Sequence, residues 1–205
     1  MFKLIPSSFF AIIFTIILFS GCTDYKEAMK VLPNELSIAD SCKNINKNLE
    51  RDCYDLISYK NSFAQIRLGL NAQIKGNYEE AFQRYLIAKQ KKNFYVNSLL
   101  AELYNNGYGV TKNKDTVIEL LKDVKEVDPI AAYKLAFHYL AKKDNKEALR
   151  LLNFAATNNV KNAQLELAKI YSNGEITETD LQKSLYWNEQ YKDKTNSFIT
   201  KIYGI

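Results

Sequence analysis

Few residues in this chain have the chemistry for catalysis or metal binding. The sequence contains one histidine, His138, and three cysteines, Cys22, Cys42 and Cys53. A Cys-His or Ser-His-Asp site would depend on His138, and a multi-histidine metal site cannot form. The cysteines also lack the CxxC spacing that is typical of zinc ligands. The sequence therefore predicts no catalytic residue, no metal ligand and no cofactor.

Carboxylates and glycines give little more support for an enzyme. Glu79 and Glu80 are adjacent, so their side chains would point about 100° apart on a helix and form a solvated first turn. Gly107-Tyr108-Gly109 lacks the Lys-Ser or Lys-Thr that follows a phosphate-binding loop. A polysaccharide or peptidoglycan hydrolase with two catalytic carboxylates remains the least favoured functional alternative.

The charge pattern argues against nucleic acid as a partner. The formal net charge is only +5. Arginine is the residue best suited to bidentate contacts with phosphates and base edges. The few arginines are scattered along the chain at Arg51, Arg67, Arg84 and Arg150. We expect neither nucleic acid nor a small-molecule substrate as the ligand.

The N-terminus has the pattern of an export signal. Lys3 precedes an uninterrupted apolar run over residues 9–19, which is shorter than the roughly 20 residues that a membrane-spanning helix needs. The residues that follow, Ser20-Gly21-Cys22, resemble the lipobox of bacterial lipoproteins. The resemblance implies a signal peptide over residues 1–21, a lipid on Cys22 and, with Thr23 next, an outer-membrane anchor that holds the domain in the periplasm. An uncleaved N-terminal helix is the alternative.

Cys42 and Cys53 are expected to form a disulfide in an oxidising compartment. On one continuous helix, residues eleven positions apart would be about 16 Å apart, whereas a disulfide requires about 4.4–6.8 Å between Cα atoms. The asparagine-rich segment at 44–48 provides a plausible turn. We therefore predict a disulfide-linked helical hairpin, with two unpaired buried thiols as the alternative.

A repeat runs through the rest of the chain. A leucine followed by a small residue recurs at intervals of 32, 35 and 32 residues, and each leucine has a small or β-branched residue four positions earlier. A second set of residues in pairs seven positions apart, most of them alanine or valine, marks a following helix. The leucines that define the first helix of each repeat are Leu68, Leu100, Leu135 and Leu167.

The loops give the repeat a family resemblance. Tyr104 to Val110, with its Gly-x-Gly-Val segment, resembles the Sel1-like repeat, and Gly76 to Ala81 resembles the related tetratricopeptide repeat. The resemblance covers about residues 62–192. It implies an all-α, right-handed α-solenoid of about four helix-turn-helix repeats with an N-terminal helical hairpin as a cap. We assign residues 22–35 to a tether, 36–192 to the helical-repeat domain and 193–205 to a C-terminal cap or tail.

The predicted function is binding of another protein. Stacked helix pairs expose a concave groove lined by their first helices, and tyrosines supply rigid contacts there. Resemblance to Sel1-like lipoproteins implies either a periplasmic scaffold or adaptor in an envelope complex, or an immunity lipoprotein that neutralises a toxic effector such as a type VI secretion phospholipase. The candidate partner-binding residues are Tyr104, Tyr108, Tyr133, Tyr139 and Tyr171.

Overall fold

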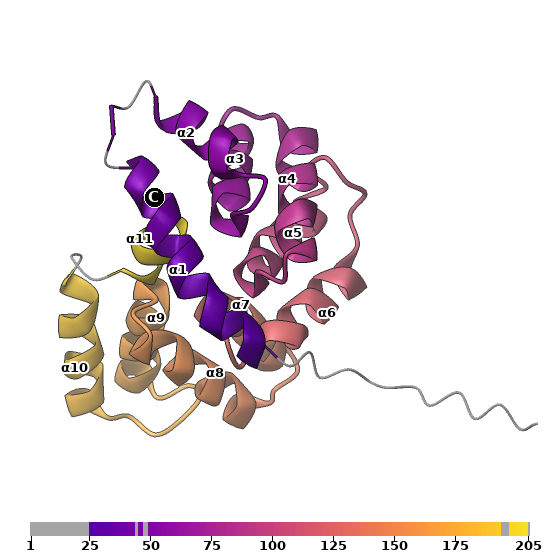
Figure 1. Ribbon diagram of the computed structural model, residues 1–205. Coiled ribbons are helices and arrows are strands. Elements are labelled where there is room, and N and C mark those ends of the chain that lie inside the picture. The colour runs from indigo at the N-terminus through magenta and orange to yellow at the C-terminus, as the bar shows by residue number, and fades with distance from the viewer. Residues whose placement is uncertain (1–24, 44, 47–48, 194–196, 205) are drawn as a thin grey trace, which may run out of the picture.

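The computed structural model describes residues 25–43, 45–46, 49–193 and 197–204, and every regular element in these residues is a helix (Figure 1). The predicted signal peptide and Cys22 lie outside the described residues. No helix in the described ranges combines the length and apolar content that a membrane crossing requires.

Four helix pairs follow one another along an arc, which confirms the predicted α-solenoid (Figure 1). Within each pair the two helices pack closely, and the second helix of one pair contacts the first helix of the next. The pairs are α3 (Ser62–Ile74) with α4 (Tyr78–Gln90), α5 (Asn97–Asn106) with α6 (Lys114–Val124), α7 (Pro129–Ala141) with α8 (Asn145–Thr157), and α9 (Lys161–Asn173) with α10 (Leu181–Lys192). A short 3-10 helix, η1 (Phe94–Val96), leads into α5.

Polar caps set where most of these helices begin. An asparagine or aspartate precedes the first helical residue, and its side chain accepts a hydrogen bond from a backbone amide of the first turn. Such caps are Asn61, Asn77, Asn113, Asp128, Asp144 and Asp180. Helices α5 and α9 end at Gly107 and Gly174, whose left-handed backbone suits glycine and stops the helix.

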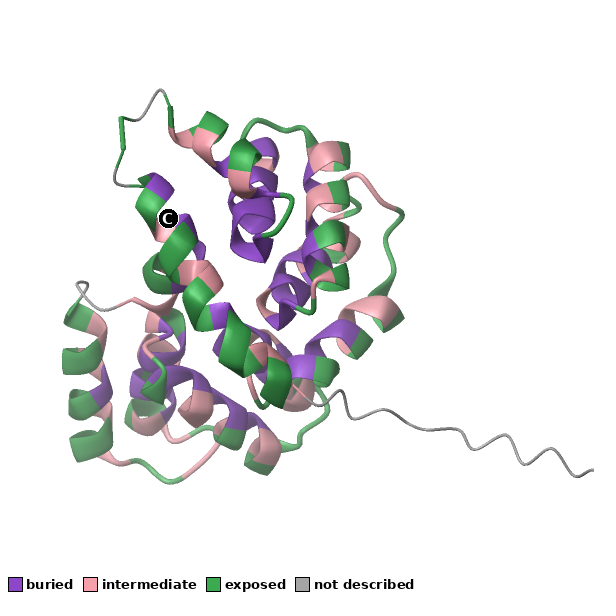
Figure 2. Cartoon of the chain, in the orientation of Figure 1, coloured by how far each residue is buried: buried purple, intermediate pink, exposed green. Residues whose placement is uncertain are grey.

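The predicted apolar stripes form the core. The four leucines that mark the first helices are all buried, and so are the small residues one turn before them. Ala81, Ala88, Ala148 and Ala155 of the second helices are fully buried. Figure 2 shows the buried residues on the facing sides of neighbouring helices. These small side chains allow the close approach of helices that solenoid stacking needs.

The N-terminal hairpin consists of α1 (Lys26–Lys43) and α2 (Glu50–Ile57). A disulfide joins Cys42 to Cys53, with 5.6 Å between the Cα atoms. The structure differs from the predicted tether over residues 26–35, because these residues are the first half of α1. Leu32 is buried, and Tyr25 packs on η1 and α6. Pro33 lies inside α1 and does not end it.

The C-terminal helix α11 (Phe198–Tyr203) lies on the inner surface of the arc. It was expected to cap or trail the last repeat, but it turns back and contacts α3. Arg67 donates to the carbonyl of Ile202 at 3.2 Å, and the Tyr203 hydroxyl donates to the carbonyl of Tyr95 at 2.9 Å. Ile202 and Tyr203 are buried, so α11 fills part of the concave surface.

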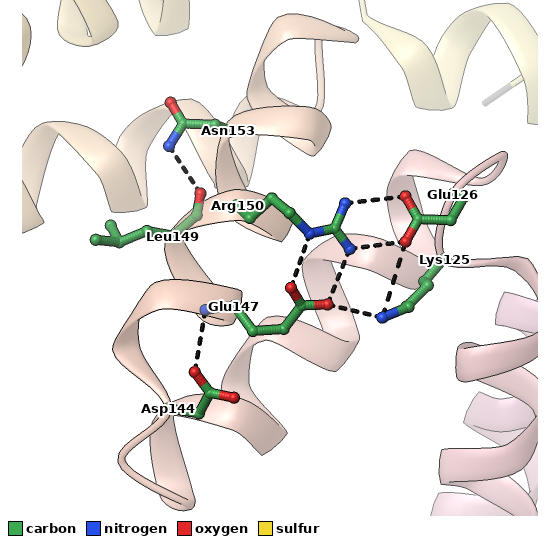
Figure 3. Close-up of polar contacts among 7 residues, drawn as sticks. All are labelled: Lys125, Glu126, Asp144, Glu147, Leu149, Arg150 and Asn153. Atoms are coloured by element: carbon green, nitrogen blue, oxygen red, sulfur yellow. Dashed lines mark hydrogen bonds and ion pairs between the residues drawn. The ribbon is translucent and has the colours of Figure 1, made fainter.

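An ion-pair network links the second and third repeats at the outer surface (Figure 3). Glu147 of α8 accepts hydrogen bonds from Arg150 and from Lys125, each at 2.7 Å. Arg150 also binds Glu126 with two parallel hydrogen bonds of 2.7 and 2.9 Å. The hydrogen bonds from Arg150 and Lys125 hold the pKa of Glu147 at about 2. The network fixes the end of α6 against α8.

Candidate protein-binding groove

Part of the concave surface is an open groove between α3, α5, α7 and α11. We call it the inner groove; its volume is about 370 Å³. Its apolar lining comes from all four helices and includes Leu70, Ile74, Leu99, Ile130, Ile199 and Tyr203. Ile74 is 77% exposed at the groove edge, whereas Leu70, Leu99 and Ile130 form a buried base.

A connected set of polar groups lies among these apolar residues. Lys134 of α7 pairs with Glu102 of α5 at 3.0 Å and also donates to the carbonyl of Ser98. Gln73 of α3 donates to the other oxygen of Glu102 at 3.1 Å and accepts from the hydroxyl of Tyr85. The charges of Glu102 and Lys134 therefore balance each other within the groove. The hydrogen bonds connect the first helices of three repeats, α3, α5 and α7, at the groove surface. Such a network provides rigidity and polar contacts at fixed positions.

Two tyrosines form an aromatic wall at the end of the groove. The rings of Tyr78 and Tyr108 are stacked, with centroids 4.2 Å apart and an angle of 12° between the planes. Tyr108 is brought there by the loop after α5. In that loop Gly109 has a φ of +64°, and a side chain on it would meet the backbone oxygen of Tyr78 at 2.5 Å. The Gly-x-Gly loop therefore allows the close backbone contact that positions Tyr108.

Of the five tyrosines predicted to bind a partner, Tyr108 lines the inner groove. Tyr104 packs edge-to-face against Phe82 of the preceding repeat. Lys125 lies over the ring of Tyr139, and Lys183 lies over that of Tyr171. These three tyrosines share one repeat position, and their contacts are with their own repeat or a neighbouring one.

The fifth candidate, Tyr133, belongs to a different part of α7. Its ring packs edge-to-face against that of Phe137, which is 40% exposed. Burial, together with the nearby Glu166 charge, raises the pKa of Tyr133. Tyr133 is not among the residues that line the inner groove.

Several groove residues were missed by sequence reasoning. Ile199 and Tyr203 belong to a segment that was treated as a cap or tail, and nothing local in the sequence indicates that it returns to α3. Ile74 carried a weak signal, because it is an apolar residue at the end of a first helix and lies off the repeating leucine stripe. Glu102 lies two positions after Leu100 and Lys134 one position before Leu135, so the repeat does not align them and gave no signal for their ion pair.

A larger cavity of about 920 Å³ lies along α6 and is lined by charged residues of both signs together with His138. Burial, with the charges of Lys142 and Lys122, lowers the pKa of His138. Within the described ranges, no three His, Cys, Asp or Glu side chains converge in a way that could hold a metal ion. The charged residues that line this cavity come from α4, from α6 and from the end of α7.

Comparisons with known proteins agree with this architecture. The Sel1 repeat model matches residues 97–120, 129–160 and 161–190. These segments coincide with the second, third and fourth helix pairs, so the chain carries Sel1 repeats over these residues. Proteins built from such repeats generally serve as scaffolds for protein interactions.

Two solved structures share the fold. A Sel1 repeat protein from Oxalobacter formigenes has a TM-score of 0.66 at 21% identity, with 81% of this chain and 74% of that chain covered. The second is c5321, a protective antigen present in uropathogenic Escherichia coli strains and displaying an SLR fold. Its TM-score is 0.59 at 23% identity, and the match covers 82% of this chain but 39% of that longer chain. No curated protein sequence matches this chain.

Proposed function

We propose that this chain is a non-enzymatic scaffold or adaptor that binds a segment of another protein in the inner groove. The observation that carries the proposal is the groove itself: an open apolar surface over a fixed polar network, on the concave side of a repeat solenoid. Repeat solenoids use this side for extended partners. An exposed apolar side chain such as Ile74 provides the contact that a partner would bury.

The charges of the groove support binding rather than catalysis. Glu102 and Lys134 neutralise each other, and Gln73 occupies a further hydrogen-bonding site on the carboxylate. The arrangement of these groups suits recognition, because they are already positioned before a partner arrives.

We further propose that a lipid on Cys22 holds the domain at the periplasmic face of the outer membrane. The support is the sequence pattern, in which a basic residue, an apolar run and Ser20-Gly21 precede Cys22. The disulfide between Cys42 and Cys53 is consistent with an oxidising compartment.

The proposal is tested by affinity purification of the full chain from its native envelope. We expect a specific protein to be enriched with the unaltered chain and with Leu56→Glu, a control at an exposed leucine of α2. Ile74→Glu should reduce the recovery of that protein by about tenfold, because it places a charge at an apolar contact on the groove edge. Equal recovery with Ile74→Glu, or turnover of a substrate by the purified chain, would contradict the proposal.

A further inference from the structure

The distance between Cys22 and the folded domain is short. Tyr25 is fixed on the domain, because its ring packs edge-to-face on Phe94 with centroids 5.1 Å apart and its hydroxyl donates to Asp123 at 2.7 Å. Three residues of extended chain reach at most about 11 Å. A lipid on Cys22 would therefore hold the surface around Tyr25 close to the bilayer. This argument rests on the lipid anchor put forward above.

The surface around Tyr25 is rich in lysine. Lys89 and Lys92, at the end of α4, line the same cavity as Tyr25. Lys26 and Lys30 lie in the first turns of α1, and Lys122 precedes Asp123 on α6. All five lysines are exposed. Asp24, Glu27 and Asp123 are the acidic residues nearest to Tyr25 in sequence or contact. Glu27 pairs with Lys30 at 2.7 Å, and Asp115 and Glu119 line one cavity with Lys89 and Lys122, so the unbalanced lysine charge is concentrated at Lys92 and its neighbours at the end of α4.

An exposed apolar residue accompanies the lysines. Met29 lies one turn after Tyr25 on α1 and is 51% exposed. Flexible apolar side chains flanked by lysines are typical of surfaces that sit at the headgroup level of a bilayer, where lysine stems extend their charges to the phosphates. We define Met29 and the five lysines as the anchor-side patch.

We propose that the anchor-side patch rests on anionic phospholipid headgroups and fixes the orientation of the domain on the membrane. Each lysine close to an anionic bilayer strengthens binding about fivefold. The charge of the patch complements this surface, and the short connection to Cys22 brings the two together. The domain then stands on the bilayer at the N-terminal end of α1. Helix α10 lies well away from this end in Figure 1.

Depth-dependent fluorescence quenching tests the orientation on the acylated full chain. The chain is reconstituted into vesicles of phosphatidylglycerol and phosphatidylcholine that contain brominated lipid. Met29→Trp is compared with Leu185→Trp, which places a tryptophan at a 64% exposed apolar position of α10. The signal of the native Trp187 is subtracted from both. We expect quenching for Met29→Trp and none for Leu185→Trp, and equal quenching at the two positions would overturn the proposal.

Vesicle partitioning tests the role of the lysines without the lipid. A chain beginning at residue 22 with Cys22→Ser keeps every described residue. It should bind phosphatidylglycerol vesicles and not pure phosphatidylcholine vesicles. Lys89→Gln with Lys92→Gln should lower the partition coefficient about 25-fold, from the fivefold per lysine above. The matched pair Lys183→Gln with Lys192→Gln on α10 should change it less than about twofold. Equal effects of the two pairs, or no binding, would overturn the patch.

Metabolic labelling of Cys22 with palmitate separates the two ideas. If the chain carries no label but binds anionic vesicles through Lys89 and Lys92, the lipid anchor fails and the patch stands. If the chain is labelled but Met29→Trp and Leu185→Trp are quenched equally, the anchor stands and the patch fails. Recovery of the groove partner with Ile74→Glu is independent of both results.

Discussion

At the scale of single residues, a buried polar contact joins successive repeats. Asp128 begins α7 by accepting from the amide of Ile130 at 2.9 Å, and it also accepts a hydrogen bond from the hydroxyl of Ser98 in the preceding first helix. Asn93 makes the corresponding contact one repeat earlier, where it donates to Ser62 at 2.9 Å. The residue before a first helix therefore cross-links that helix to the previous one.

The carboxyl group of Asp128 makes this contact dependent on pH. Asp128 is fully buried, and burial raises its pKa to about 6, although hydrogen bonds from Ser98 and the amide of Ile130 oppose the shift. The folded state therefore binds the proton more tightly than the unfolded state, whose aspartate has a pKa of about 3.9. The contribution of Asp128 to stability is greatest below pH 4 and falls as the pH rises to about 6.

Asp128→Asn should remove this dependence. The amide keeps the shape of the group and carries no charge to desolvate. Relative to the unaltered chain, we expect the free energy of unfolding of the variant to improve by roughly 2 to 3 kcal/mol between pH 4 and pH 7. Urea unfolding at both pH values measures this change. A difference between the two chains that does not vary with pH would show that Asp128 titrates normally.

At the scale of elements, the loops between paired helices differ in how strongly they require glycine. Gly109 combines a φ of +64° with a close approach to the backbone of Tyr78 and Glu79. Gly76 has a similar φ of +77°, but a side chain on it would meet nothing within 4 Å. The loop that contains Gly109 is therefore constrained by both conformation and packing. The loop that contains Gly76 is constrained by conformation alone.

Alanine substitutions at these two glycines should separate the two requirements. Gly76→Ala should cost about 1 kcal/mol from its left-handed backbone. Gly109→Ala should cost about 1 to 3 kcal/mol more, because the Tyr78 backbone must move away. Thermal unfolding of both variants gives the comparison. Equal costs would mean that the contact between Gly109 and Tyr78 contributes little.

Some elements could be predicted from the sequence, and the positions of others could not. The helix pairs were predicted, because their buried leucines and alanines recur at a helical spacing and their glycine loops interrupt it. The positions of α1 and α11 were not, because they depend on contacts between residues far apart in sequence. Tyr25 binds Asp123, 98 residues away, and Arg67 binds Ile202, 135 residues away. No local periodicity encodes such contacts.

At the scale of the whole molecule, the arc keeps less free concave surface than a bare solenoid would. Helix α11 covers part of the first helices, and this leaves the inner groove beside it. Three of the candidate tyrosines pack within or between repeats because their shared position faces the second helices. The groove instead takes its apolar residues from α3, α5, α7 and α11. A binding surface of this kind becomes visible only when distant elements are assembled.

The last repeat leaves an apolar face in solvent. Leu181 and Leu185 of α10 are 69% and 64% exposed. They occupy the repeat positions of Tyr78 and Phe82, which pack on Tyr108 and Tyr104 of the next repeat. Within the described part of the chain no further repeat follows α10 to cover them. Their exposure therefore reflects the end of the repeat stack.

The central claim is that the inner groove is where this chain contacts another protein. Site-specific photo-cross-linking in intact cells tests it most directly, with a photoreactive amino acid placed at Ile74 in the groove or at Leu56, an 84% exposed position of α2 that does not line the groove. We predict a discrete cross-linked protein from the Ile74 position and none from the Leu56 position. Cross-links of equal yield from both positions, or none from Ile74 in a folded, disulfide-bonded chain, would contradict the account.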